Sequence, residues 1–215
     1  DYVSPYLQAC QDRSIHAADL CLCVSQYWQT ELQKHYQIEA KQVANGVNWQ
    51  QFSPVPSGIE PELRERWHLH GSPIFLTIGG IEPRKNSLNL LRAFAAVRQD
   101  LPEAQLVIAG GETLFDYHSY RETFFDLAQQ LEISIGQSLI LPGVVADAEL
   151  PALYRLADAF VFPSLKEGWG LVLLEAIASG LPVITSDQFP FTEFLNPQQA
   201  VLVNPHDSHG IAQAM

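Results

Sequence analysis

The chain has 215 residues and a formal net charge of −12, with 12 Lys and Arg against 24 Asp and Glu. A deficit of basic residues this large argues against nucleic acid as the main partner, because phosphate backbones require basic stripes on the protein surface. Hydrophobic residues make up 47% of the chain, as is typical of globular proteins, and none of the apolar runs approaches the roughly 18 residues of a membrane span.

Residues 1–48 are predicted to be the end of a preceding domain followed by a linker. The sequence begins without Met, and a helix from Pro5, a strand over 20–24 and a helix over 25–36 are together too short to bury a core of their own. Residues 45–58, NGVNWQQFSPVPSG, carry the turn residues of a linker or hinge. We expect a second domain over residues 49–215, which stops inside a helix that begins near 210.

The three cysteines, Cys10, Cys21 and Cys23, are interpreted as buried thiols. Their number is odd, and a structural zinc site would require a second pair of ligands, which the sequence does not offer. Buried thiols are typical of a reducing compartment. We therefore expect the protein in the cytoplasm.

Beyond the linker, apolar strands alternate with helices. The strands are expected at 74–78, 105–109, 139–141, 159–162, 182–185 and 200–203, and the helices between them at 87–99, 120–131, 147–156 and 171–179. Short strands that are apolar throughout are typical of a parallel sheet covered on both faces, and the connections are long enough for right-handed crossovers. The sequence predicts an α/β fold with a doubly wound, Rossmann-like parallel sheet.

Glycines and cations follow the strand at 74–78, in the segment GGIEPRKN at 79–86. Ligands of open parallel sheets bind beyond the carboxyl ends of the strands, and Gly79 and Gly80 would let the backbone approach a ligand closely. Arg84 and Lys85 lie at a helix start, where the macrodipole disfavours cations. A diphosphate would relieve that repulsion; the alternative is a solvated basic pair.

Glycine turns also follow the next two expected strands. Gly110 and Gly111 come after 105–109, and the sequence Pro-Gly-Val144 comes after 139–141. Each turn alone is ordinary loop chemistry. Their coincidence at three successive strand ends indicates one ligand site at that rim.

Two glutamates mark the helix expected at 171–179. Glu167 stands in the loop before it, where it can contact a polar ligand group or, alternatively, the helix N-terminus, an interaction worth about 0.3–1 kcal/mol. Glu175 lies inside the run LVLLEAIA. A helix apolar nearly all round is expected to be buried, and a carboxylate there is costly unless it is paired. The alternatives for Glu175 are a ligand and a structural ion pair.

Taken together, these segments resemble the family-4 retaining glycosyltransferases of GT-B fold. The donor-binding domain of that family carries a Glu-x7-Glu motif in the setting EGFGLxxLEAmAxGxPVI, and residues 167–184 read EGWGLVLLEAIASGLPVI. Residues 45–48, NGVN, resemble the interdomain NGVD element, and 79–86 resemble the GxLEPRKN variant of the phosphate loop. The resemblance extends over about residues 23–215 and implies the C-terminal half of a GT-B architecture.

The resemblance implies that a sugar passes from a nucleotide-diphosphate sugar to an acceptor with retention of anomeric configuration, without metal or other cofactor. Arg84 and Lys85 would neutralise the diphosphate, Glu167 would hold hydroxyls of the transferred sugar, and Glu175 would bind the ribose. Val144 would line the base pocket. The remaining donor contacts implied are at Gly79, Gly80, Gly110, Gly168, Gly170, Leu171 and Val172.

The chain also departs from the family. Trp169 replaces the usual Phe, Asn48 replaces the usual Asp, and Gly80 stands where many relatives carry an additional arginine. The acceptor domain, with its own glycine-rich loop and catalytic histidine, is almost wholly absent, so this piece is expected to bind nucleotide without turnover. The acceptor (a sugar, a lipid or a small molecule) and any peripheral membrane contact would belong to that absent domain.

Two other functions fit the same pattern. A nucleotide-sugar epimerase of the same fold would share the sheet and the diphosphate site, and a non-catalytic sensor would share the binding site alone. A nicotinamide-dependent oxidoreductase is disfavoured, because residues 78–82, IGGIE, lack the G-x-G-x-x-G spacing. The base and the sugar are not specified by any of these motifs.

Overall fold

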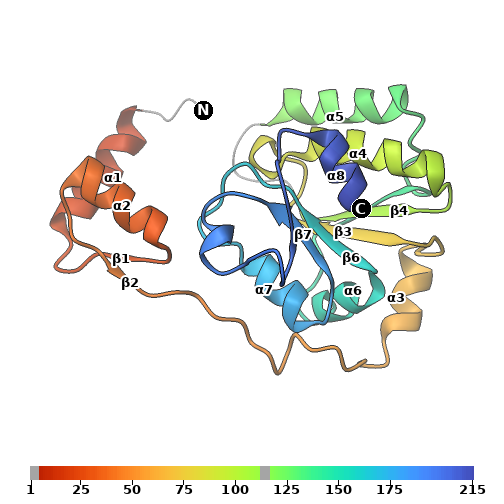
Figure 1. Ribbon diagram of the computed structural model, residues 1–215, viewed down its shortest axis with the longest axis horizontal. Helices are drawn as coiled ribbons and strands as arrows, with labels where there is room; N and C mark the ends of the chain where they lie inside the picture. Colours follow the sequence, from red (N-terminus) through yellow and green to blue (C-terminus); the bar gives the residue numbers. More distant parts are fainter. Residues whose placement is uncertain (1–4, 112–116) are drawn as a thin grey trace. The chain divides into compact units, whose positions relative to one another are not determined.

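The computed structural model describes residues 5–111 and 117–215. The chain divides into two compact units, Asp1–Asn45 and Gly46–Met215 (Figure 1). Unit 1 contains α1 (Pro5–Ala17), β1 (Leu22–Cys23), α2 (Gln26–Tyr36) and β2 (Lys41–Gln42).

Unit 1 is held together mainly by strand pairing and a helix cap. β1 pairs in parallel with β2, and the hydroxyl of Ser25 caps α2 by accepting a hydrogen bond of 3.2 Å from Trp28 N. Neither helix buries any of its described residues, in keeping with the expected lack of a core. β2 is absent from the sequence expectations, since Lys41 and Gln42 are polar and exposed.

Unit 2 is built on a parallel sheet of six strands in the order β5-β4-β3-β6-β7-β8. Their bounds are β3 (Ile74–Ile78), β4 (Gln105–Ala109), β5 (Leu139–Gly143), β6 (Ala159–Phe162), β7 (Val183–Ser186) and β8 (Val201–Val203). The chain builds outward from β3 to β5, then returns to place β6 beside β3 and continues the other way. This is the doubly wound order with a switch point between β3 and β6, and it confirms the predicted fold class.

Helices cover both faces of this sheet (Figure 1). α4 (Ser87–Asp100), α5 (His118–Gln130) and α8 (Ser208–Ala214) lie on one face, and α3 (Glu60–Arg66), α6 (Leu150–Leu156) and α7 (Leu171–Ala178) lie on the other. The core forms two clusters accordingly. Within β3, Phe75 belongs to the α4 side whereas Ile74 and Leu76 belong to the α6 side, so the strand is buried on both faces, as its continuous apolar sequence predicted.

Three local expectations were wrong. α6 begins at Leu150 rather than at 147, because Pro151 is accommodated in a first turn. β5 continues through Pro142 and Gly143 rather than ending at 141, which is permitted because it is an edge strand. α3 was missed altogether.

α7 is not buried all round, contrary to the expectation from its sequence. It buries only Leu173 and Ala176 completely, while the side chains of Leu171 and Ile177 are 45% and 41% exposed. The helix lies on the outside of the sheet and presents one face to it. Apolar residues on its other face remain accessible at the rim of the unit.

Candidate functional site

Glycines at the carboxyl ends of β3 and β4 bring two strand ends into direct contact. A Cβ on Gly110 would lie 2.4 Å from Gly80 N, and one on Gly80 would lie 2.6 Å from Gly111 O. Gly110 also has a φ of 140°, which side-chain-bearing residues rarely adopt. The three glycine turns are therefore one packed rim. Next to it, the side chain of Val144 is 81% exposed, and a Cβ on Gly111 would lie 2.6 Å from Val144 Cγ2.

Gly79 makes room for a lysine side chain. A Cβ at this position would lie 2.5 Å from Lys85 Cε and 2.9 Å from Lys85 Nζ. Lys85 can follow this path only because Gly79 lacks a side chain. The ammonium group lies 4.4 Å from the centroid of the Phe162 ring, at the end of β6, so the lysine crosses from the end of β3 to the end of β6.

Arg84 and Lys85 meet Glu167 at the switch point of the sheet. Lys85 Nζ lies 2.6 Å and Arg84 Nη1 lies 2.9 Å from the same oxygen, Glu167 Oε1. Arg84 Nε also lies 2.7 Å from Oε2 of Glu82. The three residues assigned to the reaction from the sequence are thus in one cluster, with both cations bound to carboxylates.

The two cations of this cluster differ in accessibility. The side chain of Lys85 is 10% exposed and that of Arg84 is 40% exposed. Burial lowers the pKa of Lys85, and the charge and hydrogen bond of Glu167 oppose that effect. Arg84 is therefore the cation that an incoming ligand meets first, whereas Lys85 is chiefly held against Glu167.

Ser164, Glu82 and Asn86 belong to this cluster although sequence reasoning did not select them. Ser164 is fully buried, and its hydroxyl lies 2.8 Å from Arg84 O and 3.1 Å from Glu167 Oε1. Asn86 donates its amide N–H groups to Pro163 O at 3.0 Å and Pro205 O at 2.6 Å. These bonds join the loop after β3 to the loop after β6 and, through Pro205, to the segment after β8. Their signal in the sequence is only that each residue lies close to a strand end.

Glu175 is half-buried and has a partner in the protein. Its Oε2 accepts a hydrogen bond of 2.8 Å from the hydroxyl of Tyr154, on α6. Burial raises the pKa of Glu175, the bond from Tyr154 opposes that rise, and the charge of Asp147 adds to it. This partner is a neutral hydroxyl, which the sequence alternatives for Glu175 did not include, and among the described residues no cation pairs with the carboxylate.

The segment from Glu167 to Val172 leads into α7. Gly170 precedes the helix with a φ of 97°, and a Cβ there would lie 2.9 Å from the Phe191 ring. Gly168 has open space around its Cα, and α7 begins at Leu171 without a side-chain cap. The helix amides of Leu171 and Val172 therefore lie next to Glu167 in the chain, at the rim.

Trp169 points into the protein rather than toward the rim. Its side chain is 8% exposed and stacks on Phe194 with ring centroids 4.7 Å apart. An aromatic ring at this position anchors the loop that carries Glu167. The indole ring is held by this stacking, but its Nε1–H is buried without a hydrogen-bond acceptor among the described residues.

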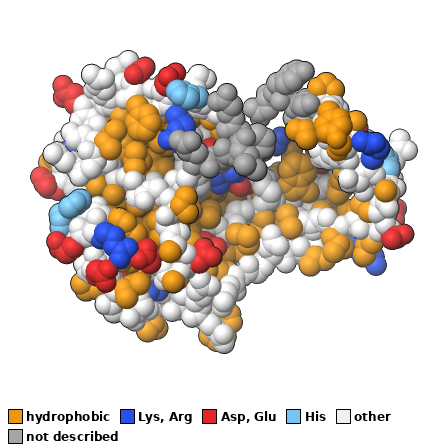
Figure 2. All heavy atoms as spheres, turned by 180° about the vertical axis from the view of Figure 1, so that it is seen from behind, with side chains coloured by type: hydrophobic (Ala, Val, Ile, Leu, Met, Phe, Trp, Pro, Cys, Tyr) orange, Lys and Arg blue, Asp and Glu red, His pale blue; other side chains and the backbone are white. Residues whose placement is uncertain are grey.

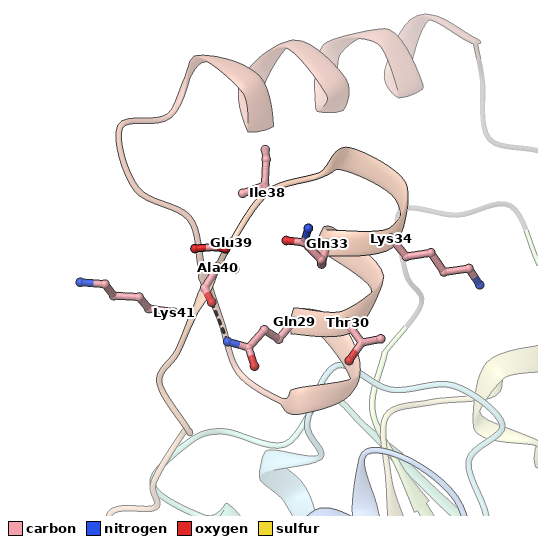
Figure 3. A pocket seen from close by; sticks show the side chains of 8 residues that line it. All are labelled: Gln29, Thr30, Gln33, Lys34, Ile38, Glu39, Ala40 and Lys41. Carbon is pink, nitrogen blue, oxygen red and sulfur yellow. Dashed lines mark hydrogen bonds between the residues drawn. The ribbon is translucent and has the colours of Figure 1, made fainter.

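Unit 1 contains a separate pocket of about 720 Å³ between α2 and the segment leading into β2 (Figure 3). Gln29 donates its amide to Ala40 O at 2.7 Å across it. Lys34 and Lys41 extend away from each other on opposite sides. The lining includes the charged residues Lys34, Glu39 and Lys41, but the two lysine side chains do not converge as Arg84 and Lys85 do on Glu167.

Several global properties of the described residues bear on function. On the face in Figure 2, acidic side chains are spread among neutral and hydrophobic ones, and the basic ones are scattered. Within residues 5–111 and 117–215, no helix combines the length and apolar character needed to cross a membrane. In the same part of the chain, no cluster of three or more His, Cys, Asp or Glu side chains is arranged so that it could bind a metal ion. Cys23 is buried, as expected, and its Sγ donates to Lys41 O at 3.7 Å. Cys10 and Cys21 are only partly buried, so the expectation of buried thiols was wrong for these two residues.

Comparison with known families gives a match over most of unit 2. A family model described as glycosyl transferases group 1 matches residues 59–215. The chain is 35% identical over 149 residues to a GDP-mannose-dependent alpha-(1-6)-phosphatidylinositol monomannoside mannosyltransferase of Mycobacterium tuberculosis, covering 66% of this chain and 36% of that protein. It is 30% identical over 202 residues to the serotype-specific mannosyltransferase WbdA of Escherichia coli, covering 92% of this chain and 24% of that protein.

Solved structures show the same architecture. HepE of Anabaena, in complex with UDP and glucose, superposes with a TM-score of 0.80 at 20% identity, covering 99% of this chain and 58% of that one. The C-terminal domain of a glycosyl transferase group 1 family protein (LpcC) from Francisella tularensis superposes with a TM-score of 0.64 at 27% identity, covering 78% of this chain and 85% of that one. The chain spans between about a quarter and about half of the curated relatives it matches.

Proposed function

Because the chain belongs to the glycosyl transferases group 1 family and has the GT-B fold, we propose that unit 2 is the donor-binding half of a glycosyltransferase. The whole protein would transfer a sugar from a nucleotide-diphosphate sugar to an acceptor with retention of configuration. The observation that carries the proposal is the cluster of Arg84, Lys85 and Glu167 at the switch point of the sheet, where ligands of such folds bind.

Arg84 is the proposed main contact for the diphosphate. Its Nε and one N–H of Nη1 engage Glu82 and Glu167, so the second N–H of Nη1 and both N–H groups of Nη2 remain to donate to phosphate oxygens. Lys85 lies behind it and adds positive charge. When the bond between sugar and diphosphate breaks, negative charge grows on the leaving diphosphate, and fixed cations stabilise that charge most in the transition state.

Glu167 is proposed to hold the transferred sugar. Its Oε1 is bound by Lys85, Arg84 and Ser164, which fixes the carboxylate and directs Oε2 elsewhere. Two carboxylate oxygens with different tasks allow the residue to stay anchored while accepting a sugar hydroxyl. The helix amides of Leu171 and Val172 are proposed to face the sugar and phosphate.

Glu175 and Val144 are proposed to hold the nucleoside. Glu175 would accept the ribose hydroxyls, and the exposed Val144 would lie against the base beside the rim formed by Gly80 and Gly110. Within the described residues, Glu175 makes no hydrogen bond or ion pair with Arg84, Lys85 or Glu167. Its assignment is therefore supported by the Glu-x7-Glu motif and by a carboxylate that pairs with no cation among residues 5–111 and 117–215.

The proposed donor for a first test is GDP-mannose. The relatives named above are a GDP-mannose-dependent enzyme and a mannosyltransferase, whereas the structure similar at 20% identity was solved with UDP and glucose. Retention and independence from metal are supported by the motif resemblance. Analysis of the product anomer by NMR, and assay of the whole protein in EDTA, test these two points.

Unit 1 is proposed to be the end of the acceptor-binding half. The superposition on HepE covers 99% of this chain, unit 1 included, and the curated relatives are about two to four times longer. We assign the acceptor (a sugar, a lipid or a small molecule) and any peripheral membrane contact to the rest of that half, in a cytoplasmic protein. The chain alone would then bind donor without transferring the sugar.

Calorimetric titration of the chain with GDP, UDP and ADP, and then with the matching nucleotide sugars, tests the proposal. We expect one of the nucleoside diphosphates to bind at a single site, and GDP is the first candidate. Failure of all three diphosphates and their sugars to bind would remove the donor-site proposal and leave the fold alone.

A further inference from the structure

The hydroxyl of Tyr154 is placed to direct the carboxylate of Glu175. Tyr154 is fully buried on α6, and its hydroxyl lies 2.8 Å from Glu175 Oε2 and 3.2 Å from Val172 O. A phenol has one proton, and the carboxylate is the nearer and the stronger acceptor. One oxygen of Glu175 is therefore held by the protein, whereas Oε1 accepts no hydrogen bond from the part of the chain that the structure describes.

The ring of Tyr154 is fixed by other aromatic rings. Phe52 packs against it edge-on, with centroids 5.8 Å apart and planes at 81°. Phe160 of β6 lies 5.6 Å away. Because these two rings pack against the buried ring of Tyr154, the direction of its hydroxyl is set by the core rather than by the ligand.

The protonation states favour the same arrangement. Burial raises the pKa of Tyr154, and the adjacent Glu175 charge raises it further, so the hydroxyl remains a donor at neutral pH. The groups that affect the titration of Glu175 are Tyr154 and, in the turn before α6, Asp147. Of these, Tyr154 stabilises the ionised carboxylate, whereas Asp147 disfavours it.

We propose that Tyr154 is a positioning residue for nucleotide recognition: its hydroxyl holds Oε2 of Glu175 so that Oε1 accepts the vicinal hydroxyls of a ribose. The inference rests on the proposed function, because it assigns the ribose to Glu175. It adds a residue outside the Glu-x7-Glu motif, on a different helix, that determines whether the site distinguishes a ribonucleotide from its deoxy analogues.

The test is the affinity of GDP and of 2′,3′-dideoxy-GDP for the chain and for Tyr154→Phe, measured by calorimetry. The variant keeps the ring and removes only the hydroxyl. We expect GDP to bind about five- to tenfold more weakly, while the affinity for the dideoxy analogue stays within about twofold of the parent. Tyr36→Phe is the matched control, since it removes a hydroxyl that donates to Asp12 Oδ1 within unit 1, to which no donor contact is assigned. It should leave both affinities unchanged.

A loss of equal size for both nucleotides would overturn the inference, since it would reveal a general effect on the fold. So would an unchanged GDP affinity. A parent chain that binds GDP more tightly than the dideoxy analogue, combined with an unaffected Tyr154→Phe, would refute the role of Tyr154 and leave the donor-site proposal standing. If the parent chain binds UDP or ADP instead of GDP, the same comparison is made with that diphosphate and its 2′,3′-dideoxy analogue, and a parent chain that binds none of the three diphosphates would overturn both proposals.

A double-mutant cycle removes any ambiguity from altered folding. In the Glu175→Ala background, Tyr154→Phe should cause no further loss of GDP affinity, because the carboxylate that it positions is absent. An additional loss in that background would show that Tyr154 acts elsewhere and would contradict the inference. Thermal unfolding of each variant verifies that the binding measurements are made on folded protein.

Discussion

Lys85 Nζ lies 2.6 Å from Glu167 Oε1, although the two residues are 82 positions apart in the sequence. The contact bridges the ends of β3 and β6, the two strands between which the sheet changes direction. It depends on Gly79, beside which the lysine passes, and on Ser164, which holds the same carboxylate oxygen. The residues proposed to bind the diphosphate and the residue proposed to bind the sugar are therefore linked to each other by ion pairs within the protein.

Replacement of Glu167 should lower the rate of sugar transfer without weakening the binding of the nucleoside diphosphate. Glu167→Gln keeps the size of the side chain but releases Arg84 and Lys85 from a carboxylate. We expect the affinity of the chain for GDP to be equal or higher, because fewer negative charges oppose the diphosphate. The transfer rate of the whole protein should fall by about 10²–10³-fold. Calorimetry and a radiolabelled sugar assay measure the two effects, and an unchanged transfer rate would refute the role of Glu167.

The titration of Glu175 should appear in the pH dependence of nucleotide binding. Burial raises the pKa of Glu175 above the ordinary value of a glutamate carboxyl. The carboxylate must be ionised to accept two hydroxyls, so affinity for GDP should fall as the pH is lowered through this raised pKa. Glu175→Gln should bind GDP more weakly at neutral pH, and its GDP affinity should not show the fall that protonation of Glu175 causes in the parent. Because the ligand also titrates, the difference between the two proteins is the informative quantity, and parallel pH profiles would contradict the assignment.

Gly110 should not tolerate a side chain. Gly110→Ala would place a Cβ 2.4 Å from Gly80 N in a backbone with φ 140°, and we expect a loss of about 2 kcal/mol or more in the free energy of unfolding. Gly46→Ala is the control, since its Cβ would meet nothing within 4 Å. Denaturant unfolding compares the two, and equal stabilities would show that the rim relaxes easily.

The ion pair between Glu60 and Arg155 predicts how the stability of unit 2 depends on pH. Burial opposes ionisation of Glu60, but hydrogen bonds from Ser57, from backbone amides and from Arg155 outweigh it and lower the pKa of Glu60 from 4.5 to about 2. A lowered carboxyl pKa stabilises the folded state above the unfolded pKa, and this contribution is lost as the pH falls from about 4.5 toward 2.

Glu60→Gln should therefore destabilise the chain by about 1–3 kcal/mol at pH 7 and by progressively less below pH 4.5. The comparison variant is Glu62→Gln on the same helix. Its carboxylate is 69% exposed in a pair with Arg66, and such surface pairs contribute little. Thermal unfolding at several pH values distinguishes the two, and a pH-independent difference for Glu60→Gln would contradict the ion-pair explanation.

Much of the fold could be predicted because the strands of unit 2 are apolar without alternation, a pattern that requires both faces to be covered. The same logic placed Arg84, Lys85 and Glu167 at one edge, since carboxyl ends of parallel strands share an edge. α7 was predicted wrongly because composition does not reveal which face meets the sheet: Leu171 and Ile177 are as apolar as Leu173, yet they are exposed.

The partners inside the site could not be predicted, since they depend on tertiary distances. Ser164 and Tyr154 are ordinary residues in their own segments, and only the packing of α6 against α7 brings the Tyr154 hydroxyl to Glu175. Short polar elements such as β2 carry no periodic signal that distinguishes them from loops. α3 was missed because its seven residues are too few for a helical apolar pattern.

The most direct measurement is the titration of GDP into the chain and into Arg84→Ala/Lys85→Ala, at low and at moderate salt. We predict that the parent binds GDP at one site, with an affinity that declines as salt rises, and that the double variant binds at least about 10²-fold more weakly, because two charge-assisted contacts are lost. Thermal unfolding confirms that the variant is folded. The same affinity in both folded proteins would contradict the assignment of Arg84 and Lys85 to the donor diphosphate.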